Sequence, residues 1–238
     1  MKIEFRKKEY RIKNIKYIRA SNIINFTSVT KENPMVISYL GLRKAVGILG
    51  IVFPVILVLG VFIIGKDDAF QKSISMYYHT HMRDAFVGIL SAVALFLFSY
   101  TGYSWVDNLC GNLAAIFALG VAFCPCPNPQ FTIVGVIHLI SALLFFLTLT
   151  YFSLFLFTKS KPNPTARKKQ RNIVYRICGF VMLGCIVAII IFFLLPSDLK
   201  VKLEALHYVF WFETIALWSF GVSWLVKGEL IIKDDIVD

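Results

Sequence analysis

Six long apolar runs follow one another along the chain, separated by short polar segments. As helices rising 1.5 Å per residue, runs of this length cross a hydrocarbon core about 30 Å thick. They are continuously apolar, whereas the strands of a membrane barrel alternate. The runs are 45–65, 85–103, 109–126, 131–158, 177–196 and 206–226. The pattern predicts an all-α transmembrane bundle over residues 39–228, with polar ends at 1–38 and 229–238.

Composition supports a membrane protein over a soluble one. Hydrophobic residues make up 58% of the chain and charged residues 16%. The buried helices of soluble proteins seldom run so far without a charge. The first run is also longer than the apolar region of a signal peptide, and Gly65-Lys66-Asp67-Asp68 is no small-residue cleavage site.

The basic residues predict the orientation. Residues 1–44 hold eleven basic and three acidic residues, and 159–176 hold seven basic and no acidic ones. The segments 66–84 and 196–206 balance to zero. Because basic loops resist translocation, both ends of the chain are expected in the cytoplasm. The net charge of +11 therefore describes topology, and no nucleic-acid partner is expected.

The first 34 residues allow three interpretations. Ile12, Ile15 and Ile18 recur at helical spacing among basic residues, as in a helix that lies on an anionic leaflet. A disordered basic tail explains the same composition. A start at Met35 is the third.

The cysteines predict no disulfide scaffold. Cys110, Cys178 and Cys185 fall inside predicted spans and are interpreted as packing residues. Cys124 and Cys126 flank a proline at the outer end of the third span. They form either a helix-ending turn with incidental thiols, or a pair that meets an oxidising compartment or a soft metal.

Polar and ionisable residues gather on the predicted outer side. Because burying such groups in a membrane is costly, this is where a functional site is expected. The polar loop before the second span is rich in hydroxyl groups and imidazoles, and His138 and Glu213 lie about 10 Å below the starts of their helices. The predicted catalytic residues are Ser75, His79, Asp84, His138 and Glu213, the substrate-binding residues Tyr77, Tyr78 and Arg83, and the metal ligands His79, His138 and His207.

Three functions remain open for this cluster. The first is a purely structural set of caps and buried hydrogen bonds. The second is a metal or acid–base site that acts on a lipid headgroup, and the third is part of a proton or solute path. In each case we expect His138 and Glu213 to face the bundle interior and to approach one another between the second, fourth and sixth spans. The helix N-termini that meet there predict an anionic ligand.

Two resemblances bear on these alternatives. One rests on Leu42-Arg43 to Gly50, on Ser73-x-Ser75-x-Tyr77-Tyr78-x-Thr80-x-Met82-Arg83-Asp84-x-Phe86-Val87-Gly88 and on Phe220-Gly221-x-Ser223-Trp224-Leu225-x-Lys227-Gly228. These stretches resemble a group of bacterial multi-pass membrane proteins of unknown function. This resemblance covers most of residues 38–228 and implies an inner-membrane location.

The weaker similarity is to the superfamily of membrane hydrolases and receptors that includes alkaline ceramidases and adiponectin receptors. Its motif places a serine four residues before a zinc-binding histidine, as Ser75 precedes His79. The similarity implies zinc at His79 and a water-positioning role for Ser75. The chain departs from it in having six predicted spans and no His-x-x-x-His near its C-terminus.

The sequence therefore predicts a six-span membrane protein whose outward-facing polar site binds or processes a lipid headgroup, with membrane lipids as its partners. If it is an enzyme, a metal-assisted hydrolase is expected. The alternative is a small transporter or sensor, or a structural protein without catalysis.

Overall fold

The computed structural model describes residues 34–65, 70–128 and 132–233, with side chains from Tyr39 onward. The chain divides into two compact units, 1–39 and 40–238, and only the second is largely described. The predicted basic tail, with its surface-helix, disordered and Met35-start interpretations, lies almost wholly outside the described residues, so these interpretations stay predictions.

The structure is all-α over its described part, as predicted, with no strand there. Seven α-helices, one 3₁₀-helix and one π-helix are present among these residues. In chain order they are α2 (Pro34–Ile64), η1 (Ile74–His79, the 3₁₀-helix), α3 (Arg83–Phe98), α4 (Trp105–Phe123), α5 (Ile133–Tyr151), η2 (Phe152–Leu156, the π-helix), α6 (Ala166–Leu194), α7 (Ser197–Ala205) and α8 (Tyr208–Lys227).

Five helical segments are long and apolar enough to cross a membrane. They are Tyr39–Ile64, Trp105–Phe123, Ile133–Leu156, Ala166–Leu194 and Tyr208–Lys227. The predicted run 85–103 is also helical, but α3 ends at Phe98 and has only 16 residues. The chain leaves the helix there because Ser99 and Tyr100 close its last turn and the segment before α4 is extended at Ser104.

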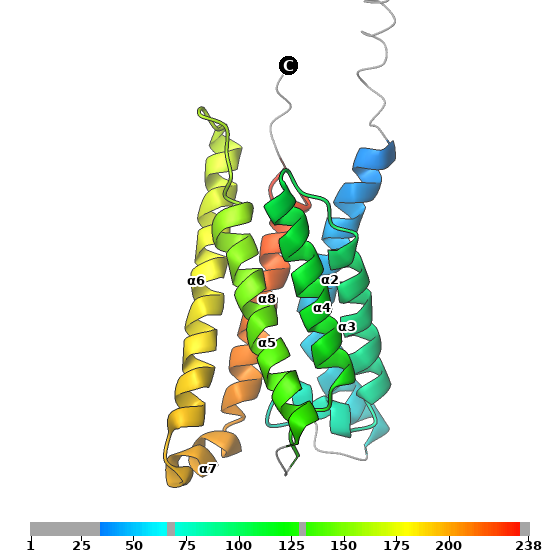
Figure 1. Ribbon diagram of the computed structural model, residues 1–238, viewed down its shortest axis with the longest axis vertical. Helices are drawn as coiled ribbons and strands as arrows, with labels where there is room; N and C mark the ends of the chain where they lie inside the picture. Colours follow the sequence, from blue (N-terminus) through cyan, green and yellow to red (C-terminus); the bar gives the residue numbers. More distant parts are fainter. Residues whose placement is uncertain (1–33, 66–69, 129–131, 234–238) are drawn as a thin grey trace, which may run out of the picture. The chain divides into compact units, whose positions relative to one another are not determined.

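Successive long helices run in opposite directions, so α5 and α8 begin at the end of the unit where η1 and α7 lie (Figure 1). We call this end of the unit the η1 end. The opposite end, where α8 stops, is called the Lys227 end. Contacts join α3 to α4, α4 to α5, α5 to α6, and α6 to α8.

Helix α8 also packs closely on α2. A Cβ on Gly221 of α8 would lie 2.7 Å from the carbonyl oxygen of Gly47 in α2, so a larger residue at Gly221 would force the helices apart. Close backbone approach at small residues is typical of helix pairs in membranes. With α6 on one side and α2 on the other, α8 is the central helix of the described bundle (Figure 1).

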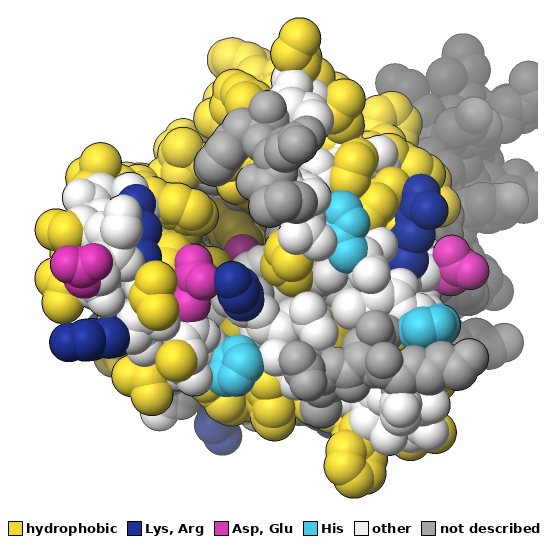
Figure 2. All heavy atoms as spheres, turned by 90° about the horizontal axis from the view of Figure 1, so that it is seen from below, with side chains coloured by type: hydrophobic (Ala, Val, Ile, Leu, Met, Phe, Trp, Pro, Cys, Tyr) yellow, Lys and Arg dark blue, Asp and Glu magenta, His cyan; other side chains and the backbone are white. Residues whose placement is uncertain are grey.

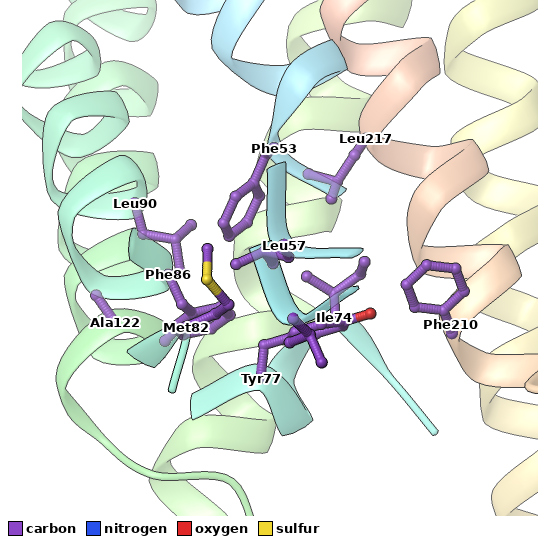
Figure 3. Close-up of a cluster of buried hydrophobic side chains, with 12 residues drawn as sticks. Phe53, Leu57, Ile74, Tyr77, Met82, Phe86, Leu90, Ala122, Phe210 and Leu217 are labelled. Carbon is purple, nitrogen blue, oxygen red and sulfur yellow. The ribbon is translucent and has the colours of Figure 1, made fainter. Parts of the chain in front are cut away.

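A buried hydrophobic cluster fixes η1 to the bundle. Tyr77 and Ile74 of η1 insert among side chains of α2, α3 and α8, including Leu57, Phe86 and Phe210 (Figure 3). The Tyr77 ring is fully buried. Burial raises the pKa of Tyr77 to about 12. The polar loop before α3 is thus held in place by its own apolar residues.

The π-helix η2 continues α5 toward the Lys227 end. The N–H of Phe157 donates to the carbonyl of Phe152, five residues earlier, at 2.8 Å. This wider turn brings the buried rings of Phe152 and Phe157 against Trp224 of α8, with ring centroids 5.8 and 5.3 Å from it.

Candidate functional site

A cavity of about 400 Å³ lies between α5, α6 and α8 at the η1 end. Figure 2 views this end and shows a hollow among hydrophobic side chains, with acidic and basic groups beside it. The polar side chains that line the cavity are Lys72, Ser73, Ser75, Cys126, His138, Glu204 and Glu213. The remaining walls are apolar, from α5, α6 and the start of α8.

Glu213 lies in the second turn of α8 and connects the cavity to η1. Its Oε2 accepts a hydrogen bond from the backbone N–H of Ile74 at 2.5 Å, and the backbone of Ser75 is a second partner. The first N–H groups of a helix have no partner within the helix. Glu213 therefore acts as a remote cap for η1 while its side chain lines the cavity.

His138, from the second turn of α5, is only 1% exposed and lines the same cavity. Its Nδ1 lies 2.7 Å from the carbonyl oxygen of Cys124. A carbonyl only accepts hydrogen bonds, so Nδ1 carries the proton and the neutral ring has its lone pair on Nε2. Nε2 is buried and has no hydrogen-bond partner within residues 34–65, 70–128 and 132–233. The cavity thus contains an unused acceptor on His138.

The sequence prediction that His138 and Glu213 face inward and share one pocket agrees with this geometry. The structure gives no direct hydrogen bond between them, because Nε2 of His138 makes none within the described part. The predicted position of the site, between the second, fourth and sixth apolar runs, differs from the position of this cavity and stays a prediction. The cavity is bounded by α6, the fifth apolar run, and not by α3, the second, which is represented only by the loop that precedes it.

Of the other three predicted catalytic residues, one lines the cavity and two do not. Ser75 lines the cavity, and its carbonyl oxygen accepts a hydrogen bond from the Cys126 thiol at 3.2 Å. His79 is exposed, and its Nε2 lies 3.0 Å from the Cys126 carbonyl oxygen. Asp84 is exposed in the first turn of α3 and does not line the cavity. There it complements the helix dipole.

None of the three predicted substrate contacts lines the cavity. Tyr77 is a core residue. Tyr78 and Arg83 pair with one another, with the guanidinium 2.8 Å from the phenol oxygen and 4.5 Å from the ring centroid. These residues hold the loop in its conformation, and the structure gives them no contact with the cavity.

Each of the three predicted metal ligands forms a hydrogen bond with a different backbone carbonyl oxygen. His207 Nδ1 lies 3.2 Å from the carbonyl oxygen of Gln71, so His207 fastens the start of α8 to the loop before η1. In the part of the chain that the structure describes, no three His, Cys, Asp or Glu side chains form a group that would hold a metal ion. The zinc site at His79, His138 and His207 gains no support and stays a prediction.

Cys124 and Cys126 are free thiols that act through their backbones, since their carbonyl oxygens accept the hydrogen bonds of His138 and His79. Burial, and then the negative charge of Glu213, raise the pKa of the Cys126 thiol to about 12. A thiol protonated at neutral pH is a poor nucleophile and metal ligand. The structure favours the helix-ending turn over the chemical interpretation.

No feature of the sequence indicated that α6 would line the cavity. Its wall residues are apolar like the rest of the run, and they are Ile186, Ile189, Ile190, Phe192 and Phe193. Lys72, which pairs with Glu204 at 2.7 Å on the rim, was also not identified as a site residue.

Comparison with protein-family models, with curated proteins and with solved structures found no match to the chain. The two resemblances noted in the sequence therefore stay predictions, and the function has to be argued from the cavity itself.

Proposed function

We propose that this chain is a six-span protein of a bacterial inner membrane, and that the cavity at its η1 end binds an amphipathic molecule from the outer leaflet. The observation that carries the proposal is a cavity with largely apolar walls into which two helices, α8 and α5, each bring one hydrogen-bond acceptor, Glu213 and His138. The polar head of the ligand contacts these groups, and its apolar chain lies against α5 and α6.

The size and walls of the cavity support a lipid-like ligand. Its volume of about 400 Å³ falls in the range of roughly 300–1,000 Å³ that is typical of small-molecule sites. Phe146 of α5 and Ile186 and Phe193 of α6 line it. Because these side chains offer no hydrogen bonds, the part of the ligand that they contact is apolar.

The polar groups favour a ligand head that donates hydrogen bonds. Glu213 offers carboxylate oxygens and His138 offers the Nε2 lone pair, and both are acceptors. The sequence predicted an anionic ligand that would accept hydrogen bonds from backbone N–H groups at the helix N-termini. Some of these N–H groups already have acceptors in the structure. Glu213 accepts a hydrogen bond from the Ile74 N–H at the start of η1, and the Thr132 hydroxyl accepts one from the Gly135 N–H at the start of α5. A primary amine or ammonium head fits the remaining groups.

The experiment compares three single-chain probes that differ only in the head: dodecylamine, dodecanol and dodecanoate. With the protein in phosphatidylcholine nanodiscs, we expect dodecylamine to raise the melting temperature most and dodecanoate least. Glu213→Gln keeps an acceptor oxygen for Ile74 but removes the charge, and should cut the preference for the amine about tenfold, as for one charge-assisted hydrogen bond.

Asp84→Asn is the matched control, because it removes an exposed carboxylate that does not line the cavity and should leave the preference intact. Equal responses of the wild type to the three probes, or an amine preference that Glu213→Gln leaves unchanged, would contradict the proposal. Catalysis at the predicted residues, one of the three alternatives that the sequence leaves open, stays a prediction.

Six crossings and cytoplasmic ends are part of the proposal. Helix α3 spans about 24 Å at 1.5 Å per residue, short of a core about 30 Å thick, and local thinning accommodates such a mismatch. It runs antiparallel to α4 and contacts it along the bundle (Figure 1). A reporter fused at Lys168 should therefore be cytoplasmic and one at Asn128 translocated; the reverse result would refute this topology.

A further inference from the structure

Three cationic side chains are buried together at the Lys227 end, opposite the cavity. Arg43 of α2, Arg171 of α6 and Lys227 of α8 are 7%, 4% and 4% exposed. Burying a charge is costly unless it is paired, and burying like charges together is costlier still. This group has no role in the cavity proposed above.

Lys227 is the least compensated of the three. Its ammonium nitrogen lies 5.1 Å from the ring centroid of Tyr103 and 5.3 Å from that of Phe157, and these cation–π contacts are attractive. It forms no ion pair and donates no hydrogen bond to any residue within the described ranges. The position at the end of α8 favours a cation through the helix dipole, but that contribution is modest.

The charges around Lys227 are mostly of its own sign. Arg43, Lys168 and Arg171 all lie close enough to repel its charge, and among the described groups only the carboxylate of Asp107 attracts it. Arg43 stacks on Tyr100 with its guanidinium carbon 5.7 Å from the ring centroid, and its Nη1 lies 3.5 Å from the Lys227 carbonyl oxygen.

The two described carboxylates in this region have other partners, although Oδ1 of Asp107 makes no hydrogen bond within the described residues. Asp107 accepts from Lys159 Nζ at 2.9 Å and from the Ser104 N–H and hydroxyl, as part of the capping box that starts α4. Glu229 lies 3.5 Å from Nη1 of Arg171. Neither contacts the Lys227 ammonium, so among the described residues the groups nearest to that ammonium are mostly cationic.

We infer that the Lys227 end holds a binding site for a phosphate-type anion, with the Lys227 ammonium as its direct ligand. Arg43, Lys168 and Arg171 raise the positive potential around it. Arginine and lysine groups form the strongest hydrogen bonds with phosphate oxygens, and basic pockets between membrane helices bind the headgroups of anionic lipids.

The aromatic residues beside the site favour a lipid as the source of the phosphate. Tyr103 and Trp105, at the start of α4, are exposed, and such rings are enriched where a membrane meets water. A headgroup that displaces the Tyr103 ring reaches Lys227 from the interface. Inorganic phosphate has the same chemistry without the apolar chains, so the test has to distinguish the two.

The test uses the full chain in phosphatidylcholine nanodiscs, with and without phosphatidylglycerol, and separately with inorganic phosphate at constant ionic strength. We expect phosphatidylglycerol to raise the melting temperature of the wild type. Lys227→Met should weaken the binding of phosphatidylglycerol about tenfold, as for the loss of one charged hydrogen bond. Lys200→Met, which removes the same charge from α7 at the other end, is the matched control and should respond like the wild type.

A response to inorganic phosphate as well as to phosphatidylglycerol supports the site and identifies phosphate itself as sufficient. Equal responses of wild type and Lys227→Met, or no response of the wild type to either anion, would overturn the inference and leave the aromatic rings as the whole environment of the lysine. If Lys227→Met does not fold, Lys227→Arg takes its place in the binding test, and native mass spectrometry of the wild type tests lipid binding independently. The wild type should then retain phosphatidylglycerol over phosphatidylcholine, and equal retention would also overturn the inference.

Discussion

The two ends of helix α8 differ in how the bundle treats polar side chains. At the η1 end, Glu213 and His138 hold backbone groups and line a cavity with apolar walls. At the Lys227 end, the helices close on aromatic rings, and the charged groups are packed among them. The difference teaches that the bundle leaves a cavity beside its polar groups at one end, whereas at the other end aromatic side chains fill the space around buried cations, so a ligand there has to displace a ring.

Removing Trp224 should have the largest effect on this contrast. Trp224 is fully buried and packs against Tyr100, Phe152, Phe157 and Phe220. Trp224→Ala opens a cavity at the filled end and should lower the free energy of unfolding by about 3–5 kcal/mol, measured by reversible unfolding in detergent.

Trp105→Ala is the matched control, since Trp105 is exposed and should change the stability by less than about 0.5 kcal/mol. If the two substitutions cost the same, the Lys227 end is not the packed end of the bundle, and the contrast drawn above fails.

A smaller effect should appear in alkali at the η1 end. The pKa of the Cys126 thiol is raised to about 12 from its usual 9.0, because burial disfavours the thiolate. The unfolded chain therefore loses this proton near pH 9 while the folded chain keeps it. The contribution is fully present below pH 9 and is lost as the pH rises toward 12, at about 1.4 kcal/mol per pH unit.

Cys126→Ser removes this titration but keeps a hydrogen-bond donor for the Ser75 carbonyl oxygen. Unfolding at pH 8 and pH 10 should show a steeper loss of stability in the wild type than in the variant. Parallel loss in the two proteins would mean that Cys126 is not buried as the structure has it. Tyr77, whose pKa is also raised to about 12, contributes in the same direction in both proteins and cancels from the difference.

The sequence predicted the fold better than the site, and the reason is physical. Long apolar runs leave few alternatives to helices, so α2, α4, α5, α6 and α8 were all anticipated. The short helix α7 was not, because the segment 196–206 was interpreted only as a balanced loop. His138 and Glu213 were identified because burial makes isolated ionisable groups conspicuous in an apolar run.

The rest of the site depended on which faces of the helices meet. The polar loop was interpreted as a source of ligands, yet Tyr77 is a core residue, and His79 and His207 hold backbone carbonyls. The type of a polar residue does not reveal whether a backbone group will be its partner. The buried cations had a similar ambiguity, because Arg43, Arg171 and Lys227 were counted as topological charges with no information on their burial.

The π-helix η2 carries a consequence for how this chain tolerates changes in length. A π turn holds one residue more than an α turn, and one residue corresponds to about 100° of rotation in an α-helix. Deleting a single residue within Phe152–Leu156 would let the segment relax to an α-helix without breaking the backbone. Because the extra residue fits within one turn, the chain after the deletion would keep nearly the same angular position, whereas a deletion elsewhere in α5 would rotate everything that follows by about 100°. The segment Phe152–Leu156 is thus the place along this continuous helix where the chain should best tolerate the loss of one residue.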